Sequence, residues 1–278
     1  MKIGLFGINF GPCAEPEALA RVARAAEDAG LESLWTGEHV VLPDPQVPPS
    51  PAPPGTPMLD PSAALAFAAA HTRSVRLGTG IIILPQRNAV ELAKELASVD
   101  VLSGGRLIVG LGAGYLEPEF RALGANFRER GALTDESIDV LRALWTQEKP
   151  HFEGRFHRFE GVDAHPRPLQ RPHPPIVIGG MSRAAARRAA CRGNGWYGFL
   201  TSPEQTARSL AWIREAVAAG ERPSALGELE ISVTPPPLDR DTLKRYEELG
   251  VHRIIGTTLA RDVDSVLRFV EELAGYVR

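Results

Sequence analysis

The 278-residue sequence has little of what marks secreted, membrane or nucleic-acid-binding proteins. Its only cysteines, Cys13 and Cys191, lie far apart without a CxxC pair, which excludes a disulfide framework and is typical of a reducing compartment such as the cytoplasm. No apolar run approaches the roughly 18 residues that a membrane-spanning helix needs. The formal net charge of -3 offers no basic field to nucleic acid. We therefore expect a soluble cytoplasmic protein with no membrane segment and no nucleic-acid partner.

The sequence also lacks the residue patterns of two common kinds of catalytic site. The sequence contains no G-x-S-x-G elbow and no Cys-His signature, which argues against a nucleophilic hydrolase. Four histidines cluster in the middle of the chain, but their spacing matches no zinc pattern and no carboxylate triad accompanies them: His151, His157, His165 and His173. We expect no protein-held metal.

Short apolar runs alternate with helical periodicity along the whole chain. Strands are predicted at 2–8, 32–36, 75–83, 106–112, 175–179, 195–199, 229–234 and 252–257, and helices at 15–29, 60–71, 88–102, 134–147, 182–191, 203–219, 239–249 and 262–275. The first run is interrupted by Gly4, Gly7 and Asn9, which favours a strand over a signal segment. Eight such units in this length predict an α/β fold, a (β/α)8 TIM barrel that forms a single domain over residues 1–278.

One other architecture fits the alternation less well. An open doubly wound sheet could use GLGAG at 110–114 as a dinucleotide turn. The glycine spacing there is G-x-G-x-G rather than G-x-G-x-x-G, and no helix start follows directly. The closed barrel is therefore the favoured prediction.

Two segments are longer than the loops that a simple alternation of strand and helix needs. Residues 43–61, after the second strand, hold nine of the 24 prolines and predict an extended loop. Residues 148–174, before the fifth strand, alternate aromatic residues with glycines and predict an inserted hairpin. Loops of this kind carry activity at the carboxyl end of a barrel.

Glycines are concentrated in the third and fourth predicted strands. Glycine inside a strand marks a bulge, a bend or the close approach of a ligand or another backbone. The glycines lie at 78, 80, 110, 112 and 114. We expect them to leave room for something flat or bulky, with a local bulge at Gly80-Ile81 that could extend to a cis peptide bond.

Two strand ends carry candidate functional residues. Glu38 and His39 follow the second strand, where the histidine could transfer a proton with Glu38 setting its orientation, or could simply hydrogen-bond a backbone carbonyl. Gly179 and Gly180 precede a helix, so backbone N–H groups there could bind a phosphate. Ser182 could instead cap that helix without any ligand.

Five segments together resemble one known family. They are LWTGEHVV at 34–41, VRLGTGIIILPQRNAVELAKELASVDVLSGGRL at 75–107, GLGAGYLEPEFRALGANFRERG at 110–131, TDESIDVLRALW at 134–145 and PPIVIGG at 174–180. They resemble the luciferase-like superfamily, and within it the coenzyme F420-dependent oxidoreductase branch. The resemblance covers about the first 200 residues and fades toward the C-terminus.

This resemblance implies a TIM barrel with a deazaflavin or flavin across its carboxyl-end mouth, a small-molecule substrate and a homodimer. Glu38 and His39 would lie near the reactive edge of the ring. The residues implied to bind the cofactor are Thr79, Gly80 and Ile81 at a non-prolyl cis bond behind the ring, Gly112 and Ala113 on its other side, and Gly179, Gly180 and Met181 at its phosphate. Branches that oxidise sugar phosphates carry tryptophan and glutamate where this chain has Pro43 and Tyr115, so we do not expect that activity.

Three functions follow from the resemblance. We expect F420-dependent hydride transfer to or from a small organic substrate, with the cofactor supplying the chemistry and the protein supplying position. The first alternative is a two-component monooxygenase that uses reduced FMN. The second is a barrel that binds flavin without catalysis.

Overall fold

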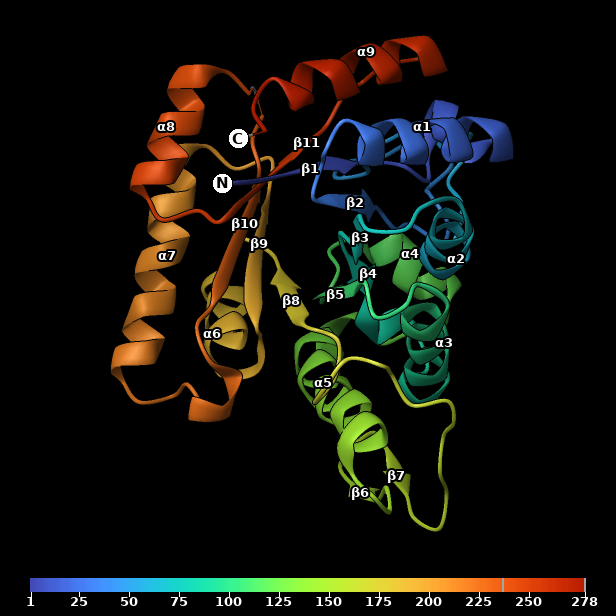
Figure 1. Ribbon diagram of the computed structural model, residues 1–278. Coiled ribbons are helices and arrows are strands. Elements are labelled where there is room, and N and C mark those ends of the chain that lie inside the picture. The colour runs from blue at the N-terminus through green and yellow to red at the C-terminus, as the bar shows by residue number, and fades with distance from the viewer. Residues whose placement is uncertain (237, 278) are drawn as a thin grey trace.

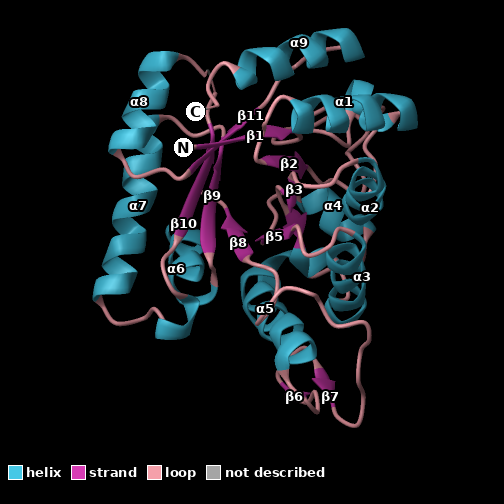
Figure 2. Cartoon of the chain, viewed as in Figure 1, coloured by secondary structure: helices cyan, strands magenta, loops and turns pink. Residues whose placement is uncertain are grey.

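The computed structural model describes residues 1–236 and 238–277. Within them, parallel strands close into a barrel that helices surround (Figures 1 and 2). The barrel strands are β1 (Lys2–Phe6), β2 (Ser33–Thr36), β3 (Arg76–Thr79) with its continuation β4 (Ile82–Ile83), β5 (Leu107–Gly112), β8 (Ile176–Gly179), β9 (Gly195–Phe199), β10 (Glu230–Thr234) and β11 (Arg253–Gly256). The order around the barrel is β3-β2-β1-β11-β10-β9-β8-β5, and pairing of β3 with β5 closes it. The predicted (β/α)8 barrel is confirmed.

Helices follow the strands as the periodicity predicts. They are α1 (Pro16–Asp28), α2 (Pro61–His71), α3 (Ala89–Leu102), α4 (Glu117–Ala122), α5 (Arg130–Thr146), α6 (Arg183–Arg192), α7 (Pro203–Ala218), α8 (Arg240–Glu248) and α9 (Val263–Ala274), with short 3-10 turns at Gly11–Ala14, Leu84–Gln86, Phe127–Glu129 and Ser224–Leu226. Capping explains several starts: Asp60 accepts hydrogen bonds from the first turn of α2, and Ser202 forms a capping box with Gln205 at α7. Helix α4 was not expected from the sequence, and α5 begins four residues before its predicted start.

Both insertions are present. The proline-rich segment 43–61 is an irregular loop, which the side chain of Asn9 ties to the barrel by donating to the carbonyl oxygens of Gly37 and Leu59, at 2.9 and 2.7 Å. The second insertion contains the antiparallel hairpin β6 (Phe152–Glu153) and β7 (Arg158–Phe159), beside α5 (Figure 1). The carboxylate of Glu136 on α5 accepts hydrogen bonds from three successive backbone N–H groups of the hairpin turn, at 155–157.

The interior of the barrel is filled by a small aromatic and aliphatic cluster, separate from the large core between strands and helices. Its members are Phe6, Trp35, Ile108, Val177, Tyr197 and Ile255. The rings of Trp35 and Tyr197 lie 5.6 Å apart at their centroids. The barrel is therefore a packed core whose ends alone are available to ligands.

A buried ion-pair network closes the amino end of the barrel. The guanidinium of Arg253 is fully buried and donates to both carboxylate oxygens of Glu32, at 2.8 and 2.7 Å. It also donates to the Ser232 hydroxyl at 3.0 Å and pairs with Glu230. Its central carbon lies 5.6 Å from the ring of Trp35. Among the described residues, no helix combines the length and the apolar character that crossing a membrane requires.

Candidate functional site

The third barrel strand is interrupted where the sequence predicts a bulge. Strand β3 ends at Thr79, the Gly80-Ile81 peptide bond is cis, and β4 resumes at Ile82. The hydroxyl of Thr79 donates to the carbonyl oxygen of Gly110 and accepts from the N–H of the same residue, both at 2.7 Å. The predicted bulge and the cis bond implied by the family resemblance are both confirmed. The one hydrogen of the Thr79 hydroxyl is therefore used by the neighbouring strand.

The glycines of β5 and β8 make room for this bulge. A Cβ atom on Gly110 would lie 1.8 Å from the carbonyl oxygen of Thr79. A Cβ on Gly112 or Gly179 would lie 2.6 Å from a methyl group of Ile81. Ile81 and the Thr79 backbone thus fill the space beside these three glycines, as the close approach of another part of the chain. Contact between a cofactor and the backbone of Gly112 and Gly179 stays a prediction.

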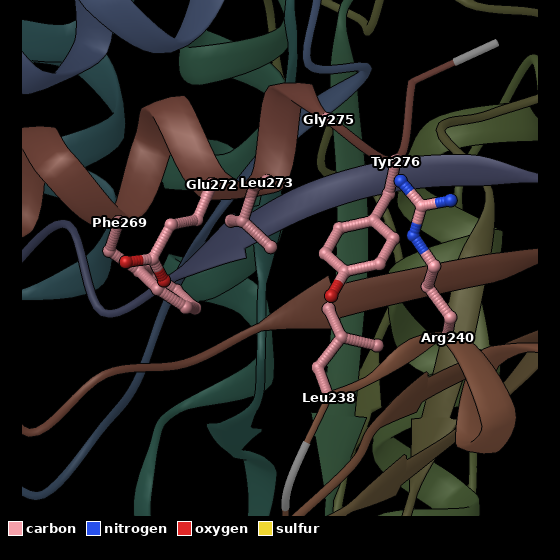
Figure 3. A pocket seen from close by; sticks show the side chains of 7 residues that line it. All are labelled: Leu238, Arg240, Phe269, Glu272, Leu273, Gly275 and Tyr276. Carbon is pink, nitrogen blue, oxygen red and sulfur yellow. The ribbon is translucent and has the colours of Figure 1, made fainter.

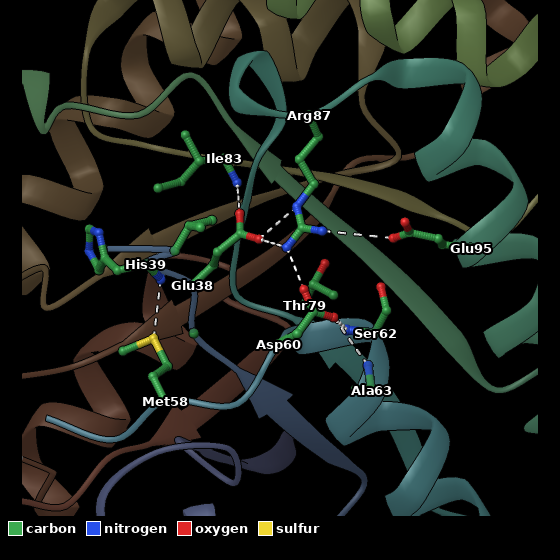
Figure 4. Close-up of polar contacts among 12 residues, drawn as sticks. Glu38, His39, Met58, Asp60, Ser62, Ala63, Thr79, Ile83, Arg87 and Glu95 are labelled. Carbon is green, nitrogen blue, oxygen red and sulfur yellow. Dashed lines mark hydrogen bonds and ion pairs between the residues drawn. The ribbon is translucent and has the colours of Figure 1, made fainter. Parts of the chain in front are cut away.

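Glu38 holds the bulge in place. Its buried carboxylate accepts hydrogen bonds from the N–H of Ile83 and from Nε of Arg87, the latter at 2.9 Å, and Arg87 also pairs with Asp60 at 2.6 Å (Figure 4). Burial raises the pKa of Glu38, and the Arg87 guanidinium opposes that shift. Figure 4 shows the His39 ring apart from this carboxylate. The expectation that Glu38 orients His39 is therefore wrong.

Glu119 is the acid that orients His39. Its side chain is fully buried on α4, and one carboxylate oxygen lies 3.1 Å from Nδ1 of His39 while the other accepts from the N–H of Val40 at 2.6 Å. Burial alone would raise the pKa of Glu119, but hydrogen bonds from His39 and Val40 lower it below its usual value. An ionised carboxylate only accepts hydrogen bonds, so Nδ1 carries a proton, and Nε2 can act as an acceptor whenever it carries none.

Tyr115 completes this group. Its hydroxyl lies 3.3 Å from Nε2 of His39, the two ring centroids are 5.8 Å apart, and the tyrosine is 48% exposed. Burial and the charge of Glu119 raise the pKa of Tyr115, so the phenol stays protonated near neutral pH. His39 is also tied to the proline-rich loop, because its N–H donates to Sδ of Met58 at 3.1 Å (Figure 4). The arrangement presents an acceptor nitrogen and a phenol side by side.

The turn before α6 is anchored and exposed. The hydroxyl of Ser182 accepts from the N–H of Ala185 at 3.1 Å, so the predicted capping role is confirmed. The carbonyl of Gly180 accepts from Nε1 of Trp196 at 2.8 Å, while Gly180 and Met181 are themselves exposed. The nearby arginines are paired: Arg183 with Glu215 on α7, Arg188 with Asp135 on α5, and Arg187 with Glu221 in the loop after α7.

The comparisons with known proteins agree with this geometry. A family model described as luciferase-like monooxygenase matches residues 5–275. The chain belongs to the luciferase-like monooxygenase family. It is therefore an oxidoreductase, as the sequence resemblance implied.

Luciferase-like relatives include characterised and uncharacterised proteins. An uncharacterised protein of Mycobacterium tuberculosis is 30% identical over 266 residues, 92% of each chain. The FMNH2-dependent dimethylsulfone monooxygenase of Pseudomonas putida is 44% identical over 108 residues, 38% of this chain and 30% of that protein.

Two solved structures are similar to this one over the whole chain. The monooxygenase RslO1 from Streptomyces bottropensis is 26% identical, with a TM-score of 0.79 over 100% of this chain and 98% of that chain. An F420-dependent secondary alcohol dehydrogenase, solved with an F420-acetone adduct, is 18% identical, with a TM-score of 0.80 over 100% and 99%. The second likeness shows the fold alone.

Two cavities lie away from this luciferase-like site. One of about 320 Å³ lies between α9 and the segment that leads into α8 (Figure 3), and is lined by Leu238, Arg240, Phe269, Glu272, Leu273, Gly275 and Tyr276. Another of about 420 Å³ lies beside the hairpin insertion at residues 148–151 and 161–163. In the described part of the chain, no group of three or more His, Cys, Asp or Glu residues is arranged to hold a metal ion.

Sequence reasoning missed Glu119, Tyr115 as a partner of His39, and Arg87. Tyr115 and Glu119 stand in the YLEPEF segment directly after β5, at the end of the barrel where function is expected. A buried acid in that position was the available signal. Its partner is 80 residues away in the sequence, so local pattern could not connect them.

Proposed function

We propose that the protein is a coenzyme F420-dependent oxidoreductase that transfers hydride to or from a small organic substrate. One observation carries the proposal. His39 is fixed by the buried carboxylate of Glu119 so that Nε2 stands beside the Tyr115 hydroxyl at the carboxyl end of the barrel. Hydride transfer between a carbon and a deazaflavin needs a coupled proton at the substrate oxygen, which is what such a histidine manages.

The residues near the bulge fit a deazaflavin or flavin. Gly80, Ile81, Ala113 and Gly179 are partly exposed and uncharged, as a flat ring requires. The exposed backbone at 180–181 precedes α6, where N–H groups and the helix dipole favour a phosphate. When bound, the ring would supply the hydride acceptor or donor.

His39 holds and moves the proton. In alcohol oxidation, Nε2 accepts the hydroxyl proton while Nδ1–H stays hydrogen-bonded to Glu119, whose charge stabilises the imidazolium that forms. In carbonyl reduction, Nε2 returns that proton to the oxygen. The Tyr115 hydroxyl donates a second hydrogen bond at the same oxygen. The loop at 43–61, tied to His39 through Met58, excludes water as a lid does.

A second function has specific support. Reduced FMN with oxygen would make the protein a two-component monooxygenase, and the 44% identity to the dimethylsulfone monooxygenase, together with the likeness to RslO1, favours it. The same residues fit both cofactors, because each has a tricyclic ring and a phosphate. A barrel that binds flavin without catalysis is the remaining alternative.

The deciding experiment is titration of the purified protein with F420 and with FMN, measuring both dissociation constants by fluorescence. Tighter binding of F420 and F420-linked turnover support the proposal. Tighter binding of FMN, with oxygen consumption on adding reduced FMN, establishes the monooxygenase. Binding without turnover establishes the non-catalytic barrel. His39→Ala should bind cofactor normally and lose turnover, and normal turnover would remove His39 from the mechanism.

We further propose that the protein is a cytoplasmic homodimer. The outward side chains of α2 are apolar, with Phe67 37% exposed between Ala63 and Ala70, which are also exposed. A helix face of this kind is usually covered in solution. Light scattering coupled to size-exclusion chromatography measures the mass directly.

A further inference from the structure

The carboxyl end of the barrel is nearly free of charge. The three residues after each barrel strand include no lysine or arginine and a single acid, Glu38, over the ranges 7–9, 37–39, 84–86, 113–115, 180–182, 200–202, 235–237 and 257–259. Arg87 neutralises Glu38, as described above. The nearby Arg130 donates to the carbonyl oxygens of Gly114 and Phe127, at 3.3 and 2.8 Å, and lies 3.9 Å over the Phe127 ring. Among the described residues that directly follow the barrel strands, no charged side chain therefore lacks a partner.

Apolar side chains are exposed at the same end. They follow β2, β5, β8 and β9, whose carboxyl ends meet around one mouth. They are Val40, Val41, Tyr115, Met181, Phe199 and Leu200, between 37% and 49% exposed. Phe199 lies against the buried Phe6, with ring centroids 4.8 Å apart. Exposed apolar groups gathered at one place on a soluble protein mark a binding site.

Two polar groups stand side by side in this site. Nε2 of His39 accepts a hydrogen bond and the Tyr115 hydroxyl donates one, 3.3 Å apart. A single substrate oxygen can bind both groups, whereas a carboxylate or phosphate would lose its hydration without gaining a cation. We infer that the substrate is an uncharged, mainly apolar molecule with one alcohol or carbonyl oxygen. An alcohol donates to Nε2 of His39 and accepts from the Tyr115 hydroxyl, and a carbonyl accepts from Tyr115 and from His39 when Nε2 carries the proton. The reaction of this substrate rests on the proposed function, whereas the predicted binding of the substrate does not.

The substrate class is tested by measuring turnover in the presence of whichever cofactor binds. For butan-2-ol, hexan-2-ol and octan-2-ol, kcat/KM should rise about 4-fold per buried methylene, which corresponds to about 0.8 kcal/mol. The anion 3-hydroxyoctanoate should be turned over at least about 100-fold less efficiently than octan-2-ol. Equal or better turnover of the anion overturns the inference.

A charge introduced at the mouth should reverse this preference. Val41→Lys, on an exposed loop position, should lower kcat/KM for octan-2-ol and raise it for 3-hydroxyoctanoate. The matched control is Val217→Lys at the far end of α7, which is equally exposed and should change neither value. The same shift in both variants would overturn the inference.

Direct binding separates this inference from the proposed function. Saturation-transfer NMR on the protein should detect octan-2-ol and not 3-hydroxyoctanoate, and Tyr115→Phe should weaken the alcohol signal. Failure to bind F420 and FMN, with this selectivity intact, refutes the proposed function alone. Binding of the anion, or no binding of the alcohol, refutes the substrate class whatever the cofactor result.

Discussion

Replacing Glu119 with glutamine tests the proton-handling site most sharply. The amide has nearly the shape of the carboxylate, but one of its two ends donates hydrogen bonds instead of accepting them. If the amide oxygen of the glutamine still accepts from the N–H of Val40, its NH2 group faces Nδ1 of His39. Because that NH2 group donates, Nδ1 must accept, and the ring proton moves to Nε2. Nε2 then no longer accepts a proton from a substrate alcohol.

The size of the loss follows from the bond that is removed. A hydrogen bond to a charged group contributes about 1.5–3 kcal/mol, and each 1.36 kcal/mol in the barrier is tenfold in rate, so kcat should fall about 10- to 150-fold. KM should change little, because Glu119 does not reach the mouth: its side chain is fully buried. The acid limb of the kcat/KM profile should move to lower pH, since the imidazolium loses its counter-charge.

The assay is steady-state kinetics from pH 5 to pH 9, with thermal unfolding as a check on folding. Glu117→Gln is the matched control, because Glu117 lies on the same short helix and is exposed. It should leave both kcat and the pH profile unchanged. A Glu119→Gln enzyme with wild-type kcat and an unmoved acid limb refutes the role of Glu119.

Three further predictions concern stability and assembly. Gly110→Ala should lower the free energy of unfolding by about 1–3 kcal/mol or more, because its Cβ would lie 1.8 Å from a backbone oxygen, while the open Gly55→Ala should cost little in urea unfolding. Phe67→Asp should convert the proposed dimer to a monomer in light scattering. Burial would raise the pKa of Glu27, but hydrogen bonds from the backbone N–H groups at 73–75 lower it to about 2. Glu27 therefore stabilises the fold above its unfolded pKa of about 4.3, and this is lost as pH falls toward 2; Glu27→Gln should flatten that pH dependence.

Each of these has a clear contrary result. Equal unfolding energies for the two glycine variants would mean that β5 shifts without cost. A wild-type mass for the Phe67 variant would place the dimer contact elsewhere or show a monomer throughout. An unchanged acid dependence for the Glu27 variant would show that the hydrogen bonds persist in the unfolded state or contribute nothing.

The barrel was predictable because its signals are local. Each strand is a short apolar run bounded by glycine, proline or polar residues, and each helix has its own periodicity and cap. The predicted strand 75–83 is interrupted at the bulge that Gly80 indicated. Helix α4 was not predicted because its six residues are too few to show a helical period.

The contacts of the site were not predictable in the same way. Glu38 and His39 are neighbours in sequence, but adjacent side chains of a non-helical segment point to different sides, so each meets a different partner. The glycines were correctly identified as making room. The space beside them is filled by Ile81, and this depends on packing between neighbouring strands, which cannot be read from the sequence.

The ion-pair network around Arg253 has a kinetic consequence. Because its guanidinium and the ring of Trp35 seal one end of a barrel whose interior is already packed, ligands can bind only at the opposite end. The proposed cofactor and substrate would share that end, so whichever lay deeper would have to bind first and leave last. For the proposed reaction, a sealed amino end therefore predicts ordered binding and release.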